Sequence, residues 1–292
     1  MDCLLRDALS DVVEQATGEA FRAESFQSCH GGCIHESGVV SDGVRSFFVK
    51  INGLDAETMF AAEAMGLQAL GEVRALRIPR VIGQGATSNQ AFLVLEALDL
   101  GGRPSGGEWR QLGVSLAALH RIQGPSHGWD GDNFIGKTPQ ANGRHDSWAE
   151  FFVEERLRPQ FAMAEANGFS FPDAEDFMKR AGELLAGHHP IPSLLHGDLW
   201  SGNVGFNGSG EPAIFDPATY HGDRETDLAF TEFFGGFAPE FYAAYRESYP
   251  LEGGYEKRRD LYNLYHVLNH ANLFGGGYAS QAQGMMRSLS NL

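Results

Sequence analysis

The sequence predicts an α+β fold of two lobes, in which a small sheet-rich lobe precedes a larger helical lobe. Short strand-like apolar runs, broken by glycine-containing turns, fill much of residues 21–96. From about Asp99 onward, apolar residues recur at helical spacing between Gly and Pro loops. We therefore expect an N-terminal lobe over residues 1–98 and a C-terminal lobe over residues 99–292.

The N-terminal lobe opens with apolar residues at helical spacing and then changes to strand-like runs. Asp55 is the expected N-cap of a long helix that ends before the break at Ile78-Pro79. In order, we expect a helix over 4–16, strands over 21–29 and 34–52, a helix over 56–73, and strands over 80–82 and 90–96. Gly31-Gly32 and Ser41-Asp42-Gly43 break these strand-like runs, and the second break has the residues of a hairpin turn.

The C-terminal lobe is expected to be mostly helical, with one isolated hairpin. Helical spacing of apolar residues covers 109–119, 148–166, 173–185, 237–248 and 255–274. Two short strands, 203–206 and 213–215, flank the turn sequence Asn207-Gly208-Ser209-Gly210.

Composition excludes several classes of function. The chain has 22 Lys and Arg against 38 Asp and Glu, a formal charge of −16, so binding to nucleic acid through a basic surface is excluded. The apolar runs fall far short of the roughly 20 residues that a membrane-spanning helix needs, so we expect no membrane partner. Three cysteines, unevenly placed, predict a reducing, cytoplasmic location.

The strongest local signal is LLHGDLWSGN at 194–203, followed by AIFDPA with Asp216 at its centre. Asp198 and Asn203 lie five positions apart in a glycine-containing loop, and the hairpin returns Asp216 towards Asn203. A carboxylate beside a hydroxyl nucleophile, with an amide oxygen and a second carboxylate for Mg²⁺, suits metal-assisted phosphoryl transfer. Taken alone, an Asp and Asn pair at this spacing is more often turn chemistry.

The N-terminal lobe supplies matching partners for a nucleotide. Lys50 ends the FFVK strand, and Glu63 lies at the edge of the apolar face of the long helix, where a carboxylate needs a cationic partner. Taken alone, Lys50 is more often a solvated strand end. Gly31 and Gly32 lie between two predicted strands, where we expect backbone N–H groups to contact phosphate oxygens, although a Gly pair alone marks an ordinary hairpin. Residues Glu96, Ala97 and Leu98 would form the hinge whose backbone pairs with adenine.

Several segments resemble the fructosamine kinase family, also called ketosamine-3-kinases, and the resemblance covers nearly the whole chain. It is carried by GGCI (31–34), FFVKIN (47–52), MFAAEAMGLQAL (59–70), LLHGDLWSGN (194–203), FDPATYHGDRETDLAFTEFFGGF (215–237) and LYNLYHVLNHANLFGGGY (261–278). The middle of the chain also matches, at LAALHR (116–121), GWDGDNFIGKTPQAN (128–142) and SWAEFFVEERLRPQ (147–160). The resemblance implies a bilobal protein-kinase-like fold, with ATP and Mg²⁺ as cofactors. It implies phosphorylation of the sugar 3-hydroxyl of ketoamines, either free or on glycated proteins.

The same resemblance implies roles for individual residues. Asp198 would accept the proton of the substrate hydroxyl, Asn203 and Asp216 would bind Mg²⁺, and Lys50, held by Glu63, would contact phosphate. One departure from the family pattern is Tyr220-His221-Gly222, where Tyr-Tyr-Gly is common. This change leaves the chemistry intact and alters the expected surroundings of the acceptor.

Other residues carry competing interpretations. Cys29, His30, Cys33 and His35 suggest zinc, but residues alternating along a strand point to opposite faces, so an accessible Cys33 thiol is the better functional hypothesis. Such a thiol would let two copies form a reversible intermolecular disulfide, so the chain would be a monomer or a redox-dependent dimer. The alternative is that Cys33 is an unreactive structural cysteine.

Residues close to the LLHGDLWSGN segment also have two interpretations. Trp200 is expected to stack on the sugar, against a role in wedging the loop into the core. Asp227 is expected to cap a helix and brace the catalytic loop rather than touch substrate, and His196 to be scaffold. His266 and His270, four apart on one helix, are expected to be packing or substrate-side residues, because the Glu of a zinc-protease motif is missing between them.

Two other functions remain open from the sequence. One is a small-molecule phosphotransferase of the aminoglycoside or choline kinase type. The other is a nucleotide-binding pseudokinase that acts as a scaffold, which the intact set of Lys50, Glu63, Asp198, Asn203 and Asp216 argues against.

Overall fold

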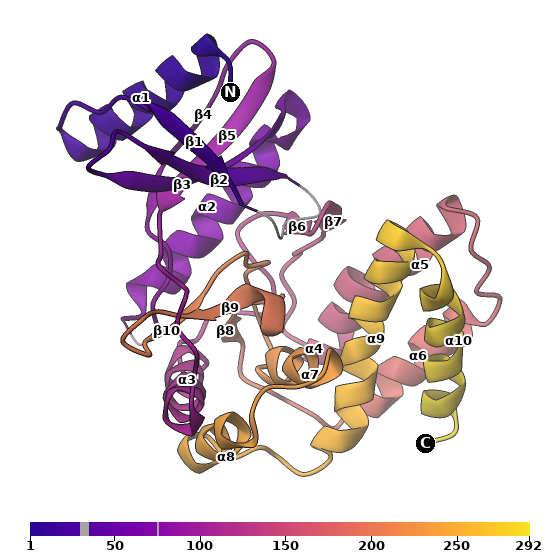
Figure 1. Cartoon of the computed structure of the whole chain (residues 1–292). Coiled ribbons are helices and arrows are strands. Elements are labelled where there is room, and N and C mark those ends of the chain that lie inside the picture. The colour runs from indigo at the N-terminus through magenta and orange to yellow at the C-terminus, as the bar shows by residue number, and fades with distance from the viewer. Residues whose placement is uncertain (30–34, 75) are drawn as a thin grey trace. The chain divides into compact units, whose positions relative to one another are not determined.

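The computed structural model of the chain describes residues 1–29, 35–74 and 76–292. Its internal contacts divide these residues into two units (Figure 1). Unit 1 comprises Met1–Arg103 with Gly205–Asp216, and unit 2 comprises Pro104–Val204 with Pro217–Leu292. The hairpin predicted after residue 203 therefore packs with the N-terminal part of the chain. The predicted α+β class is confirmed by a sheet followed by many helices.

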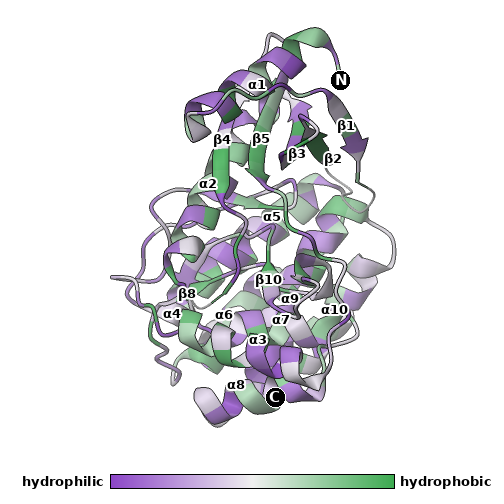
Figure 2. Ribbon diagram, turned by 60° about the vertical axis from the view of Figure 1, so that its left-hand side comes forward, coloured by the Kyte–Doolittle hydropathy of each residue, from purple (hydrophilic) through white to green (hydrophobic). Residues whose placement is uncertain are grey.

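Unit 1 is built on an antiparallel sheet, for which the described residues supply five strands in the order β1-β2-β3-β5-β4. The elements are α1 (Cys3–Thr17), β1 (Ser25–Ser28), β2 (Glu36–Ser41), β3 (Ser46–Gly53), α2 (Glu57–Glu72), β4 (Val81–Ala86), β5 (Gln90–Glu96), β9 (Val204–Phe206) and β10 (Pro212–Ile214). The five central residues of β5, 91–95, are hydrophobic and buried (Figure 2), as expected for a strand covered on both faces.

The two helices of unit 1 cover opposite faces of the sheet. Leu9 and Val13 of α1 pack against Val49 and Val94, and none of these four side chains is exposed to solvent. Lys50 is the neighbour of Val49 on β3, so its side chain points to the other face, where it meets Glu63 of α2. Burial of each such Leu or Val stabilises the fold by about 1.5–3 kcal/mol.

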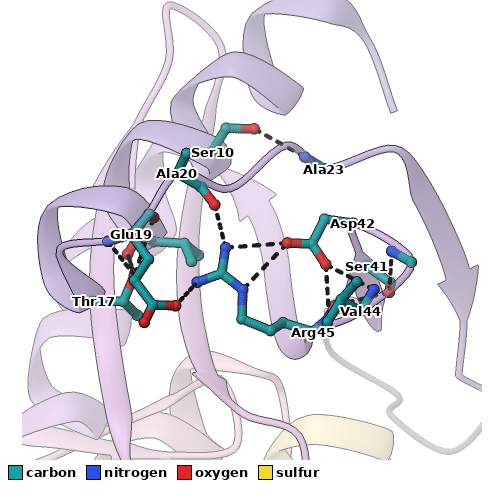
Figure 3. A network of polar contacts seen from close by, with 11 residues as sticks. Ser10, Thr17, Glu19, Ala20, Ala23, Ser41, Asp42, Val44 and Arg45 are labelled. Atoms are coloured by element: carbon teal, nitrogen blue, oxygen red, sulfur yellow. Dashed lines mark hydrogen bonds and ion pairs between the residues drawn. The ribbon is translucent and has the colours of Figure 1, made fainter.

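The turn between β2 and β3 is fixed to the end of α1 by Arg45 (Figure 3). Its guanidinium pairs with Glu19 at 3.0 Å and with Asp42 at 3.1 Å, and it donates to the carbonyl of Ala20. Backbone N–H groups of Arg45 and Val44 donate to Asp42 and hold the pKa of that carboxyl below its usual value. The predicted break at 41–43 is therefore an ordered hairpin turn.

The predicted N-cap of α2 was wrong. A 3₁₀ turn, Leu54–Ala56, precedes α2, which begins at Glu57 and has Ala56 at the N-cap with no side-chain hydrogen bond. Asp55 lies inside the 3₁₀ turn because the chain tightens there before it enters the α-helix.

Unit 2 is mainly helical, with three-residue strands between the helices. Its elements are α3 (Gly106–Leu119), β6 (Asn133–Ile135), β7 (Thr138–Gln140), α4 (Trp148–Phe151), α5 (Arg158–Ala166), α6 (Ala174–Leu185), β8 (Ser193–Leu195), β11 (Tyr220–Gly222), α7 (Glu225–Phe233), α8 (Pro239–Ser248), α9 (Tyr255–Phe274) and α10 (Gly277–Ser290). A π-helical turn, Phe152–Leu157, joins α4 to α5 and interrupts the single helix predicted over 148–166. Among the described residues, no helix is both long enough and apolar enough to cross a bilayer.

Candidate active site

The segment 194–203 forms a loop that leaves a short strand of unit 2. Strand β8 pairs with β11 in an antiparallel register that sets Leu195 opposite Tyr220, and the chain then turns at Gly197. Gly197 has φ +81°, and a Cβ at this position would lie 2.1 Å from the carbonyl oxygen of Ala218. Only glycine fits at this position, so the tight turn at Gly197 sets the position of the Asp198 backbone.

Asp227 braces this loop from the first turn of α7. One carboxylate oxygen accepts the N–H of His196 and the other accepts the N–H of Gly197, both at 2.8 Å. The imidazole of His120 also lies 3.1 Å from the same carboxylate. Burial opposes the charge on Asp227, but these hydrogen bonds outweigh it and hold its pKa below the usual value. The predicted bracing role is confirmed, and the predicted helix cap is wrong, because Arg224 occupies the N-cap of α7.

Asp198 is half-buried and is oriented by the end of its own loop. The amide of Asn203 donates to the carbonyl of Asp198 at 2.8 Å and to its carboxylate at 3.1 Å. The N–H of Asp198 donates to Nδ1 of His196 at 3.3 Å, which agrees with the predicted scaffold role of that histidine. Because Nδ2 of Asn203 donates to Asp198, Oδ1 is the side-chain atom of Asn203 that can act as a ligand or an acceptor.

A second group of candidate residues lies in unit 1. The ammonium of Lys50 is 2.7 Å from Glu63 and 2.7 Å from Asp216, and only 6% of the Lys50 side chain is exposed. Burial opposes the charge on Lys50, but the two carboxylates outweigh it and raise the pKa of the amine. The predicted pairing of Lys50 with Glu63 is present, and the structure adds Asp216 as a second partner.

Asp216 combines an accessible carboxylate with an unusual backbone conformation. Its side chain is 47% exposed although it contacts a buried lysine. Among the described residues other than glycine, it alone has a positive φ, of 59°, which L-residues adopt at a cost of about 1–2 kcal/mol. Carboxylate and amide oxygens are both hard donors of the kind that Mg²⁺ prefers, so Asp216 and Asn203 each have the chemistry that the predicted role needs.

The structure does not assign roles to the other predicted nucleotide contacts. Gly31 and Gly32 lie outside the described residues, as does Cys33. Glu96 ends β5, pairs with Arg77 at 2.5 Å and donates its N–H to the carbonyl of Arg80. The predicted hinge role of Glu96, Ala97 and Leu98 stays a prediction.

Sequence reasoning missed the residues that support Asp227 and α7. His120 is fully buried and bonds both Asp227 and, at 2.8 Å, the hydroxyl of Tyr245. Asp223, just before α7, accepts from Tyr262 at 2.6 Å and pairs with His188 at 2.7 Å. A histidine at the end of an apolar helix in LAALHR was the only available sequence signal for His120.

A family model described as fructosamine kinase matches residues 5–291 of the 292. The chain belongs to the fructosamine kinase family. It therefore belongs to a phosphotransferase family, as the LLHGDLWSGN segment and its companions predicted.

Relatives within the fructosamine kinase family match over most of their length. A probable ketoamine kinase of Synechocystis is 47% identical over 280 residues, which cover 96% of this chain and 95% of the relative. A chloroplastic protein-ribulosamine 3-kinase of Arabidopsis thaliana is 38% identical over 92% of this chain and 83% of its own length.

Solved structures agree with the family assignment. A putative fructosamine-3-kinase of Haemophilus somnus matches with a TM-score of 0.91 and 33% identity, and the match covers 96% of each chain. An aminoglycoside phosphotransferase, solved with AMP-PNP and hygromycin B, matches with a TM-score of 0.63 and 16% identity over 97% of this chain and 98% of its own. This second likeness shows a shared fold, and the predicted protein-kinase-like class is confirmed.

Proposed function

We propose that the protein transfers the γ-phosphoryl group of ATP to the sugar 3-hydroxyl of ketoamines. The observation that carries the proposal is the placement of Asp198 on a loop that Asn203 and Asp227 hold, in a chain of the fructosamine kinase family. Relatives named ketoamine kinase and ribulosamine 3-kinase support this class of acceptor.

Asp198 acts as the base in this proposal. Its carboxylate takes the hydroxyl proton as the sugar oxygen forms a bond to the γ-phosphorus and the bond to the ADP oxygen breaks. A carboxylate suits this step because it has to orient the nucleophile and accept one proton. The hydrogen bond from Asn203 fixes the rotamer of Asp198. The carboxylate is therefore already oriented when the sugar hydroxyl binds beside it.

Asn203 and Asp216 would hold Mg²⁺, and Lys50 would contact the phosphates of ATP. When bound, Mg²⁺ offsets the negative charge of the nucleotide. Lys50 also offsets the negative charge of the nucleotide with its ammonium. Glu63 of α2 fixes the direction of that ammonium. The residues Gly31, Gly32, Glu96, Ala97 and Leu98 complete the proposed nucleotide site, and Trp200 the acceptor site.

The finer predictions belong to the same proposal. The acceptors are ketoamines, either free or attached to glycated proteins, and the protein acts in the cytoplasm. It is a monomer unless oxidation of Cys33 joins two copies. The three unevenly placed cysteines support a reducing location, and a relative named protein-ribulosamine 3-kinase supports protein-bound acceptors.

A coupled assay of ADP release across an acceptor panel tests the proposal. The panel contains ribulosyl-lysine, fructosyl-lysine, an aminoglycoside and choline, with an Asp198→Ala variant as the control for contaminating kinases. We expect turnover with at least one ketoamine that exceeds the aminoglycoside and choline rates by at least tenfold, and NMR of the product should show phosphate on O3. Preferred turnover of the aminoglycoside or choline would contradict the ketoamine assignment, and ATP binding without any turnover would support a scaffold.

A further inference from the structure

An unbroken chain of aromatic rings begins at the candidate catalytic loop. Trp200 lies 5.7 Å from Phe234 between ring centroids, and Phe234 lies 5.2 Å from His270. His270 in turn lies 5.6 Å from Phe274 and 5.1 Å from Tyr278. We define these five rings as the aromatic chain. Trp200, Phe234, His270 and Tyr278 are partly exposed, and Phe274 is 57% exposed.

The backbone around the aromatic chain is shaped to place these rings. Gly275 and Gly276, between α9 and α10, have φ of 64° and 62° with ψ near −137°, a combination that only glycine adopts readily. This turn brings Tyr278 back to His270. At the other end, a Cβ on Gly202 would lie 2.3 Å from the indole of Trp200, so glycine at 202 lets that ring fold over its own loop.

His270 offers one unused acceptor in this aromatic setting. Its Nδ1 lies 2.7 Å from the carbonyl oxygen of His266, and since a carbonyl only accepts, Nδ1 carries the proton. Nε2 of the neutral ring is therefore an acceptor, and it has no hydrogen-bond partner among the described residues. Burial lowers the pKa of His270 below its ordinary value, which favours this neutral form at pH 7.

The ring faces of the aromatic chain are also free of protein cations. The cation–π contacts found among the described residues all use rings outside the aromatic chain. No Lys or Arg of the described part of the chain therefore competes for the faces of Trp200, Phe234 or Tyr278. A neutral acceptor surrounded by open π faces attracts an organic ammonium group.

We propose that the aromatic chain and Nε2 of His270 form the subsite for the protonated amine arm of the acceptor. This inference rests on the proposed function, because a ketoamine carries a secondary amine next to its sugar. The ammonium N–H donates to Nε2 of His270, and the carbon chain of the amine lies along the rings. Trp200 connects the subsite to Asp198, two residues earlier in the loop.

Two matched acceptors test the subsite. One is fructosyl-lysine, and the other is its 1-O-ether analogue, in which an ether oxygen replaces only the charged Nε of the lysine. For His270→Leu, we expect kcat/KM for fructosyl-lysine to fall about tenfold, with kcat/KM for the ether and KM for ATP within twofold of wild type. His270→Gln keeps an acceptor oxygen and should stay within about threefold of wild type on fructosyl-lysine.

Controls separate this subsite from general damage. His189→Leu changes an exposed histidine outside the aromatic chain and should leave both acceptors unchanged. Phe234→Leu removes a ring face without touching Nε2 and should lower only the rate with fructosyl-lysine, by at least threefold. Equal losses on both acceptors, or no loss with His270→Leu, would overturn the subsite alone. If the wild type turned over no ketoamine, the proposed function and the subsite would fall together.

Discussion

At the scale of single residues, Lys50 shows how a buried charge is kept for chemistry. Its ammonium has two carboxylate partners, of which Glu63 is 10% exposed and Asp216 is 47% exposed. A buried carboxylate that loses its cation costs about 3–5 kcal/mol, because desolvation is no longer offset. The buried Glu63 therefore depends on Lys50 for stability, whereas the accessible Asp216 can exchange partners with a metal ion.

We expect Lys50→Met to unfold more easily and to lose activity, and these two effects can be separated. The single variant should lose about 3–5 kcal/mol in urea unfolding, since Glu63 stays buried without a cation. The double variant Lys50→Met with Glu63→Leu should regain most of this stability and remain inactive in the ADP assay. A double variant with near-wild-type turnover would show that Lys50 serves only the fold.

The same scale shows what sequence could reveal about the site. The pairing of Lys50 with Glu63 was predictable, because helical spacing put a carboxylate at the edge of an apolar face. The contact of Lys50 with Asp216 was not, because these residues are 166 positions apart and only folding brings them together. His120 was missed for the same reason, since its partners Asp227 and Tyr245 lie more than 100 positions away.

At the scale of elements, α7 connects a buried ionic network to the catalytic loop. Asp223 receives hydrogen bonds from Tyr262 and from the N–H of Glu225, and Glu225 pairs with Arg258 at 2.7 and 2.9 Å. Two residues further along the helix, Asp227 holds the loop of Asp198. His188, Asp223 and Glu225 lie close enough to bind a metal ion, but hydrogen bonds and ion pairs within the protein already occupy them.

The stability contributed by this network should depend on pH. Burial opposes the charge on His188, but its bond to Asp223 outweighs burial and raises its pKa above the usual 6.5. The contribution of His188 is therefore complete below pH 6.5 and fades as pH rises through the raised pKa. The pKa of Asp223 is lowered, so its contribution is lost only in acid, as pH falls below 3.8.

We expect His188→Gln to destabilise the protein by about 1–3 kcal/mol at about pH 6 and by clearly less at about pH 9. Urea unfolding at the two pH values measures the difference, with His189→Gln as the exposed control. A loss that is the same at both pH values would mean that packing, rather than charge, explains the role of His188.

Elements were predictable where their pattern is local. The helix over 255–274 and the hairpin after residue 203 were found because apolar periodicity and turn residues lie within each segment. Helix α10 was missed because only Ala282, Met286 and Leu289 of its 14 residues are buried. The pairing of β8 with β11 was missed because each strand has three residues, too few for a period of two to be recognised.

At the scale of the whole molecule, the charge of −16 has to be compatible with an anionic nucleotide. Lys50 and the proposed Mg²⁺ supply positive charge locally, so the remaining acidity is available for another purpose. An acidic protein attracts cationic acceptors from a distance, and ketoamines carry a protonated amine.

We expect KM for fructosyl-lysine to rise as NaCl increases from about 0.01 to about 0.3 M, because the Debye length falls from about 30 Å to below 10 Å. The neutral ether analogue is the matched control, and its KM should change little. Equal salt dependence for both acceptors would leave the surplus charge as a feature of solubility.

The most direct measurement is the turnover of Asp198→Asn with its best ketoamine, together with the Kd for ATP. Asparagine keeps the size and hydrogen bonding of the side chain but cannot accept the hydroxyl proton. We expect kcat to fall by at least about 10²-fold, as for loss of a general base, with the Kd for ATP within twofold of wild type. A kcat near the wild-type value would contradict the role of Asp198 and the catalytic mechanism built on it.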